Sequence, residues 1–212
     1  VFEQQSKLHD WKSQPKSMAS GCPALVLAAG ASRRLGQPKA LVEVGSTTLV
    51  GLAVRRLLDA GCTPVIVVTR QELQFDVTTQ SIDATVVVNA DPDAGRTGTV
   101  QRGLLALMGD KGRVPKKVII APVDRPGWSK DHVVRLMQQK QTSNLSSSGK
   151  RGHPLLIHLN DIEQILASAP DTPLRSLIHA HPCDVDAPYL ALNIDTPEDL
   201  LLLEEAKNAL AC

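Results

Sequence analysis

Residues 23–39 read P-A-L-V-L-A-A-G-A-S-R-R-L-G-Q-P-K, and this stretch decides which fold to expect. The apolar run at residues 24–27 is typical of a buried strand, and it ends in two alanines and Gly30. A short loop then carries several cations, among them Arg34 and Lys39. Small residues let the backbone approach a ligand closely, and fixed cations suit a polyphosphate. The stretch therefore predicts a nucleoside triphosphate (NTP) site at the end of the first strand.

Apolar runs and helical patterns alternate along the rest of the chain, which is typical of a doubly wound, mostly parallel α/β sheet. A polar, Ser-rich segment at residues 141–151 interrupts the alternation and is predicted to be a mobile loop. Residues 183–186 are expected to form an edge strand. The other predicted strands are residues 24–28, 64–69, 84–88, 117–121 and 154–158, and the predicted helices are residues 49–60, 71–81, 99–108, 129–140, 161–167, 173–180 and 196–210.

Composition limits the classes of protein that are compatible with this chain. Its 212 residues, 42% of them hydrophobic, predict one domain over residues 21–212, preceded by a flexible extension over residues 1–20 that lacks the apolar centre of a signal peptide. A net charge of +1 and 2% aromatic residues argue against nucleic acid as a partner. No apolar run approaches the roughly 20 residues needed to span a membrane. Four scattered cysteines without a C-x-x-C pair fit neither a zinc site nor a disulfide framework, and favour the cytoplasm.

Three polar elements should converge where the parallel strands end, because ligands of open α/β sheets bind there. They are the loop at residues 30–39, Asp124 after a buried strand, and Asp195 before the last helix. Two carboxylates beside a polyphosphate are suitable ligands for Mg²⁺. Each element also has an ordinary structural explanation, since glycine-rich turns are common, Asp124 could form a turn, and Asp195 could cap a helix. The loop matches neither the P-loop nor the dinucleotide-binding fingerprint.

Taken together, these elements resemble one known family, the MobA/MocA-like nucleotidyltransferases of molybdenum cofactor synthesis. The similarity runs in order over residues 23–205 and rests on five motifs. They are Leu27-Ala28-Ala29-Gly30-x-Ser32-x-Arg34-x-Gly36-x-x-Lys39, Asn89…Gly95…Thr99-Val100-x-x-Gly103-Leu104, Asp124-Arg125-Pro126, Arg151-Gly152-His153-Pro154 and Asn193-Ile194-Asp195-Thr196-Pro197-Glu198-Asp199-Leu200.

The resemblance implies a single-domain, Rossmann-like sheet of the nucleotide-diphospho-sugar transferase type and transfer of a nucleotidyl group from an NTP with Mg²⁺ as cofactor. The implied catalytic residues are Lys39, Arg34 and Asp124, and the implied metal ligands are Asp124 and Asp195. The implied nucleotide-binding residues are Leu27, Ala28, Ala29, Gly30, Ala31, Ser32, Arg34, Lys39, Asn89, Gly95, Thr97 and Thr99. The implied acceptor-binding residues are Arg125, His153 and Arg175.

The nucleobase and the acceptor stay open at this point. The R-G-H-P segment favours CTP with molybdopterin, while GTP with molybdopterin or another phosphorylated metabolite is the alternative; a molybdoenzyme or its chaperone would be a further partner. His153 beside a proline also fits a structural histidine, and Arg175 a solvated arginine. Two other classes compete with the transferase: a nucleotide-binding module that has lost catalysis, and a Rossmann oxidoreductase.

Overall fold

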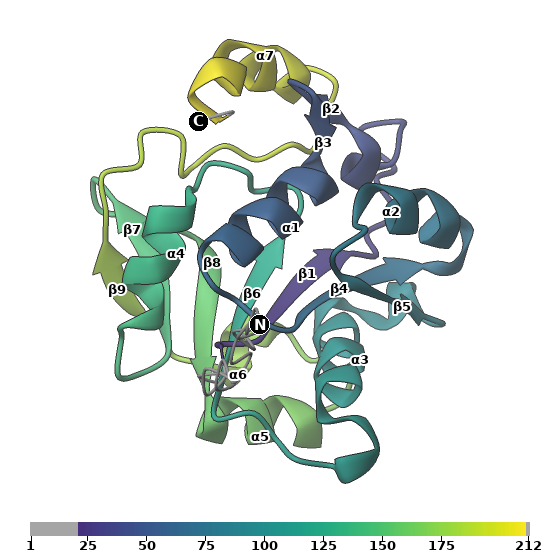
Figure 1. Ribbon diagram of the computed structural model, residues 1–212, viewed down its shortest axis with the longest axis vertical. Helices are drawn as coiled ribbons and strands as arrows, with labels where there is room; N and C mark the ends of the chain where they lie inside the picture. Colours follow the sequence, from purple (N-terminus) through teal and green to yellow (C-terminus); the bar gives the residue numbers. More distant parts are fainter. Residues whose placement is uncertain (1–20, 211–212) are drawn as a thin grey trace, which may run out of the picture.

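A seven-stranded sheet in the order β5-β4-β1-β6-β8-β7-β9 organises the molecule (Figure 1). The computed structural model describes residues 21–210, so the extension expected at residues 1–20 lies outside the described residues. The α/β fold with a mostly parallel sheet, predicted from the alternating pattern, is confirmed. The strands are β1 (Ala24–Ala28), β4 (Val65–Arg70), β5 (Thr85–Asn89), β6 (Lys117–Pro122), β7 (Ser143–Ser147), β8 (Lys150–His158) and β9 (His181–Asp184).

Helices cover both faces of this sheet (Figure 1). Apolar side chains of α1, α2 and α4 pack on one face, and those of α3, α5 and α6 pack on the other. A third apolar cluster joins α7 to the small hairpin of β2 and β3. The helices are α1 (Leu49–Asp59), α2 (Gln74–Gln80), α3 (Arg96–Met108), α4 (Lys130–Met137), α5 (Leu159–Ala167), α6 (Leu174–Leu177) and α7 (Asp199–Leu210), and the hairpin strands are β2 (Glu43–Val44) and β3 (Thr47–Thr48).

Strand β1 lies at the centre because both of its faces are apolar. Ala24 and Val26 face the α1 side, whereas Leu25 and Leu27 face the α3 side, as expected for side chains that alternate along a strand. Gly103 lets α3 pack close to the sheet, since a Cβ atom there would lie 2.9 Å from both Leu25 methyl groups. Strands β1, β4, β5 and β6 run parallel, so their carboxyl ends share one edge.

The prediction of a mobile loop at residues 141–151 is wrong, because this segment forms β7, a tight turn and the start of β8. Ser148 and Gly149 form the turn with φ of 50° and 75°, the left-handed conformation that two-residue hairpin turns require. The polar side chains that suggested a loop have local or long-range partners: Thr142 donates to the Asp161 carboxylate, and its Oγ1 accepts from the His158 backbone N–H at 3.0 Å.

The antiparallel direction of β8 matters for the site. Ile120 of β6 pairs with Leu155 of β8, and this register places His153 beside Pro122 at the end of β6. The beginning of β8 therefore lies at the same edge of the sheet as the carboxyl ends of the parallel strands.

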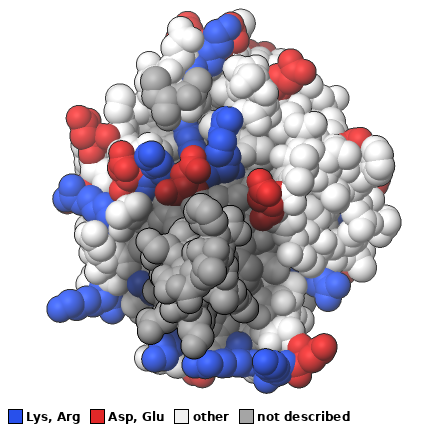
Figure 2. All heavy atoms as spheres, in the orientation of Figure 1, with Lys and Arg blue, Asp and Glu red and all other residues white. Residues whose placement is uncertain are grey.

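Several helix starts differ from the expected positions by two or three residues, and two of them lie at the ligand-binding edge. Helix α3 begins at Arg96, three residues before Thr99, and α7 begins at Asp199, after a turn at residues 196–198. None of the helices within residues 21–210 is long and apolar enough to cross a membrane. On the described part of the face in Figure 2, positive and negative side chains lie next to one another above the centre, and Lys and Arg side chains adjoin along the lower edge.

Candidate active site

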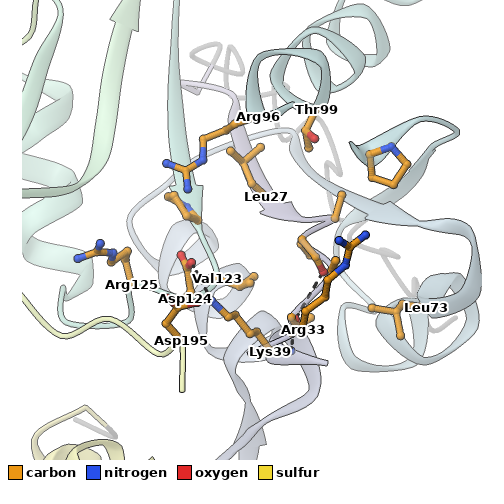
Figure 3. Close-up of a pocket in the computed structure, with 18 of the residues that line it drawn as sticks. Leu27, Arg33, Lys39, Leu73, Arg96, Thr99, Val123, Asp124, Arg125 and Asp195 are labelled. Carbon is orange, nitrogen blue, oxygen red and sulfur yellow. Dashed lines mark hydrogen bonds and ion pairs between the residues drawn. The ribbon is translucent and has the colours of Figure 1, made fainter. Parts of the chain in front are cut away.

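A pocket of about 550 Å³ lies at the carboxyl edge of the parallel strands (Figure 3). The ends of β1 and β6, the loop at residues 30–39 and the start of α3 surround it. Asp195, which precedes α7, completes the lining. The three polar elements that the sequence predicts to converge do therefore meet in one place.

Ser32 shapes the loop that follows β1. Its φ of 52° is left-handed, and its carbonyl accepts from the backbone N–H groups of Leu35 and Gly36 at 3.1 and 3.2 Å. The Ser32 hydroxyl oxygen accepts from the Lys39 backbone N–H at 3.1 Å. Leu35 is buried in the apolar cluster beneath α7. The loop is thus tied to itself and to the core, which fixes the position of its cations.

Asp124 follows β6 in a turn, where the Arg125 N–H donates to the Pro122 carbonyl at 3.3 Å. The turn interpretation of Asp124 is correct for the backbone, yet its carboxylate also lines the pocket. The Asp124 carbonyl accepts from the Ile194 N–H at 2.9 Å, which brings the segment before α7 alongside this turn.

A buried arginine supports the Asp124 turn from behind. Arg56 of α1 donates one hydrogen bond to the Pro126 carbonyl at 2.7 Å and another to the Leu210 carbonyl. Its guanidinium lies 5.5 Å from the centre of the Trp128 ring, and burial lowers the pKa of Arg56 to about 10. Arg56 therefore connects the turn to the end of α7.

Asp195 is available to the pocket because its carboxylate pairs with Lys39 and Arg34, while Asp199 bonds the backbone before α7. Asp199 Oδ2 accepts from the backbone N–H groups of Asp195 and Thr196 at 2.8 and 2.7 Å. These two bonds lower the pKa of Asp199. Asp195 does not cap the helix, because its carboxylate oxygens pair with Lys39 and Arg34 and make no hydrogen bond to a backbone N–H of α7 within residues 21–210.

The Lys39 ammonium joins the two pocket carboxylates. Its Nζ lies 2.7 Å from Asp195 Oδ1 and 3.5 Å from Asp124 Oδ2, and all three side chains are largely buried, with exposed fractions between 13% and 22%. The hydrogen bond from Lys39 is the main cause of the lowered pKa of Asp195. Arg34, 74% exposed, forms an ion pair with the other oxygen of Asp195. Both carboxylates point toward one small volume of high charge density.

This arrangement fits a divalent cation. Carboxylate oxygens are the hard ligands that Mg²⁺ and Mn²⁺ prefer, and Lys39 shows that a positive group is stabilised between them. No cluster of three or more His, Cys, Asp or Glu side chains arranged for a metal occurs within residues 21–210. A cation here would complete its coordination with water and phosphate oxygens, as Mg²⁺ commonly does.

Most of the expected nucleotide-binding residues line the pocket, and two do not. Asn89 is buried, donating to Thr99 Oγ1 at 3.1 Å and accepting from the Asp91 N–H at 3.1 Å. Thr97 is fully buried and donates to the Thr172 carbonyl at 2.6 Å. Both support the walls. The expected residues that line the pocket are Leu27, Ala28, Ala29, Gly30, Ala31, Ser32, Arg34, Lys39, Gly95 and Thr99.

Of the three expected acceptor-binding residues, one lines the pocket and two do not. Arg125 lines the pocket, whereas Arg175 is exposed on α6 and does not. His153 lies behind the pocket wall; its buried Nδ1 has no hydrogen-bond partner in the described structure. Burial, and to a lesser extent the charges of Arg96 and Arg125, lower the pKa of His153 to about 4, so its ring is neutral at pH 7.

Sequence reasoning missed Arg96, which lines the pocket from the first turn of α3. The expected helix start at Thr99 placed Arg96 in a loop. An available signal was its position directly after Gly95, where a helix following β5 would begin at the ligand-binding edge. Arg33, the neighbour of Arg34 in the loop, is 82% exposed and also lines the pocket, 3.8 Å from Asp93.

Comparison with known proteins gives a consistent family. The family model described as the MobA-like NTP transferase domain matches residues 24–185. A protein named nicotine blue oxidoreductase, from Paenarthrobacter nicotinovorans, is 33% identical over 146 residues, which cover 63% of this chain and 69% of that protein.

Two further relatives match shorter segments. A probable molybdenum cofactor guanylyltransferase of Opitutus terrae is 39% identical over 77 residues, 36% of this chain and 38% of that protein. A 2-C-methyl-D-erythritol 4-phosphate cytidylyltransferase of Rhodococcus opacus is 41% identical over 83 residues, 38% of this chain and 36% of that protein.

A solved structure confirms the fold over most of the chain. Rv0371c from Mycobacterium tuberculosis superposes with a TM-score of 0.75 at 22% identity, covering 88% of this chain and 98% of that one. A second structure of Rv0371c is described as a complex with manganese. At this identity the likeness establishes the fold alone.

Proposed function

Because the chain belongs to the MobA-like NTP transferase family, we propose that it transfers a nucleoside monophosphate from an NTP to a phosphorylated acceptor and releases pyrophosphate. Family membership confirms the resemblance that the motifs indicate, and relatives named as guanylyl- and cytidylyltransferases assign the chain to the nucleotidyltransferases. The observation that carries the proposal is the meeting of Asp124 and Asp195 at the Lys39 ammonium, 3.5 and 2.7 Å away, beside the loop at the end of β1.

The loop after β1 would bind the triphosphate. Lys39 and Arg34 supply positive charge, and the backbone from Gly30 to Ser32 offers N–H groups to phosphate oxygens. In the structure, both cations are paired with Asp195. Binding the triphosphate therefore requires them to exchange a carboxylate for phosphate oxygens, which keeps their charges neutralised throughout.

Asp124 and Asp195 would hold a divalent cation, which when bound would neutralise phosphate charge and polarise the α-phosphate. Mg²⁺ is the ion we propose. Once the carboxylates hold a cation, Lys39 is released from them and can follow the phosphate chain. The two carboxylates and the lysine thus act as one set, because each compensates the charge of the others.

The reaction needs little covalent help from the protein. An oxygen of the acceptor phosphate forms a bond to the α-phosphorus, and the bond from that phosphorus to the oxygen bridging to the β-phosphate breaks, so that pyrophosphate leaves with the bonding electrons. A phosphate monoester is ionised near neutral pH, so no strong base is required. Lys39 would offset the negative charge that grows on the phosphates, and positioning of the two substrates supplies the rest.

For the substrates we propose CTP with molybdopterin as the acceptor, with GTP and molybdopterin, or another phosphorylated metabolite, as the alternative. The R-G-H-P segment at residues 151–154 supports the first choice. The partial matches to a guanylyltransferase and to a cytidylyltransferase support the class and leave the base open. A molybdoenzyme or its chaperone would receive such a product, and the cytoplasm is the proposed location.

The decisive experiment is a panel of CTP, GTP, UTP and ATP with Mg²⁺, each with and without molybdopterin, in which pyrophosphate is detected. Release with CTP only when molybdopterin is present would support the proposal. Preference for GTP would overturn the choice of base. Turnover on a different phosphate monoester, with none on molybdopterin, would overturn the acceptor. Binding of NTP without release under every condition would favour a catalytically inactive module.

A second candidate is a redox activity, which one observation favours: the relative with the longest match reported above is named an oxidoreductase. The absence of the dinucleotide-binding fingerprint after β1 counts against it. Titration with NADH and NADPH, followed by fluorescence, tests this candidate directly. Saturable binding of either cofactor, combined with no pyrophosphate release in the panel, would replace the transferase proposal.

A further inference from the structure

Two arginines of the pocket, Arg96 and Arg125, differ from its other cations in having no anionic partner. Arg33, Arg34 and Lys39 each form an ion pair with an aspartate. For the guanidinium groups of Arg96 and Arg125, no ion pair or hydrogen bond occurs to any other residue within the range 21–210. Arg125 is half-buried and Arg96 is exposed, and both line the pocket.

These two arginines come from different elements of the sequence and lie near the same histidine in the fold. Arg96 extends from the start of α3 toward the side of the pocket that holds Asp124 and Arg125, and away from Arg33 and Lys39 (Figure 3). Arg125 leaves the turn at the end of β6. The charges of both arginines act on the same imidazole, that of His153.

His153 is a neutral neighbour of the two arginines. Its ring reaches this edge because β8 is antiparallel and starts beside the end of β6. The ring nitrogen Nδ1 is buried without a partner, although buried polar atoms are normally hydrogen-bonded. The ring is neutral at pH 7 and makes no hydrogen bond to either arginine in the described structure, so an anion with several oxygens would be bound here by the two guanidinium groups.

We propose that Arg96 and Arg125 form a clamp for a dianionic phosphate monoester, and that Arg96 is a specificity-determining residue for the second substrate. Identifying this phosphate as the acceptor's rests on the proposed nucleotidyl transfer. The clamp lies on the far side of Asp124 from Lys39, so it can hold a second phosphate while the loop holds the triphosphate (Figure 3). Guanidinium groups bind phosphate through two parallel N–H donors, which favours a dianion over a singly charged group.

Modification of individual arginines by phenylglyoxal, followed by mass spectrometry, tests the clamp without relying on turnover. The probe is inorganic phosphate at about pH 8, where the dianion predominates. At roughly ten times its Kd, phosphate should slow modification of Arg96 and Arg125 by about tenfold. Arg102, on the same helix but outside the pocket, is the internal control and should be unaffected. Equal rates at Arg96 and Arg125 with and without phosphate would overturn the proposal.

Two variants show whether the arginines act together. In Arg96→Gln the protection of Arg125 by phosphate should disappear, whereas in the matched Arg102→Gln it should persist. Unchanged protection of Arg125 in Arg96→Gln would contradict a shared clamp. Dimethyl phosphate, which has a single charge, should protect neither arginine, and protection equal to that by inorganic phosphate would contradict selection of a dianion.

The same modification experiment with CTP distinguishes failure of the phosphate clamp from failure of the proposed nucleotidyl transfer. Saturating CTP with Mg²⁺ should leave Arg96 and Arg125 reactive and leave their protection by added phosphate intact. Protection of both by CTP alone, as strong as that by phosphate, would assign them to the triphosphate and overturn the clamp. Failure of every NTP to release pyrophosphate would defeat the proposed transfer, yet the phosphate arm would still decide whether the clamp exists.

Discussion

The two sets of cations around this pocket differ in how their charge is balanced. The loop cations Arg33, Arg34 and Lys39 are each paired with an aspartate, whereas the Arg96–Arg125 pair has no acidic partner among the described residues. Paired cations can accept a ligand only by exchanging partners, which suits a substrate that arrives with its own divalent cation. Unpaired cations are ready for an anion without rearrangement. The difference indicates two anionic substrates that bind by different means.

The largest effect is expected at Asp124, which is one of the two carboxylates that pair with Lys39. Asp124→Asn keeps the shape of the side chain but removes its charge, so the proposed divalent cation would lose one ligand and Lys39 loses one partner. Turnover should fall by about 1,000-fold, in the range measured for loss of one strong electrostatic contact in an active site. Pyrophosphate release is the measurement, and circular dichroism checks that the fold is intact.

Asp93→Asn is the control for this change, because Asp93 also lines the pocket but lies next to Arg33 alone at an exposed position. Its turnover should stay close to that of the wild type. A folded Asp124→Asn protein with near-normal pyrophosphate release would remove Asp124 from the metal site.

The second effect concerns His153, whose protonation near Arg96 and Arg125 should lower the free energy of unfolding. Burial lowers the pKa of His153 from its usual 6.5 to about 4, so the folded protein binds fewer protons here than the unfolded chain does. Above pH 6.5 the ring is neutral in both states and His153 does not destabilise the fold. As the pH falls toward 4 the unfolded chain gains the proton first, and the free energy of unfolding falls by up to about 3 kcal/mol. Protonation would add a third positive charge beside the two arginines.

Urea unfolding at several pH values, in the wild type and in His153→Gln, measures this contribution. The free energy of unfolding of the wild type should fall more steeply between pH 6.5 and 4 than that of the variant. Carboxylates such as Asp195 and Asp199 contribute to both proteins equally, so the difference isolates His153. Parallel profiles would show that the ring titrates normally in the folded protein.

The third effect, that of removing the Lys39 ammonium, should change the kinetics of the NTP and not those of the acceptor. Lys39→Met retains the buried stem of the side chain and removes the ammonium between the carboxylates. The value of kcat/KM for the NTP should fall by about 100-fold, while the KM of the acceptor changes little. Steady-state kinetics with each substrate varied in turn is the measurement. Unchanged kinetics would exclude Lys39 from the site, and a selective rise in the acceptor KM would reverse the assignment of the two sets.

The smallest effect is expected at Arg34, because its side chain is mostly exposed and solvent screens its ion pair with Asp195. Arg34→Ala should raise the KM of the NTP by about fivefold. Arg33→Ala, with an even more exposed side chain, serves as the comparison and should change the KM less. A larger effect at Arg33 than at Arg34 would show that the two neighbouring arginines have the opposite roles.

The sequence predicts the parallel half of the sheet well because that information is local. Strand β1 and its loop are recognisable from a continuous apolar run that ends in small and then basic residues. The meeting of Asp124 and Asp195 follows from a general rule, since the ends of parallel strands share one edge. The role of Asp195 could not be decided from sequence, because it required knowing that its carboxylate pairs with Lys39 and Arg34, which are distant in the sequence, and not with the start of α7.

The antiparallel half is less predictable because its stability depends on distant partners. Strand β7 is rich in serine, and its backbone pairs with β8 and β9, while Thr142 just before it donates to Asp161. No local pattern reveals those partners. The position of His153 likewise depends on the direction of β8, and the position of Arg96 depends on a helix start three residues earlier than expected.

Arg56 has a practical consequence for work on this protein. Its guanidinium is bonded to the carbonyl of Pro126, two residues after Asp124, and to the carbonyl of Leu210, at the end of α7. The last turn of the final helix is therefore connected through a single side chain to the turn that presents Asp124 to the pocket. An affinity tag or a deletion that disturbs α7 at Leu210 will loosen that turn from a distance, so altered kinetics of such a protein would report the modification and not the native enzyme.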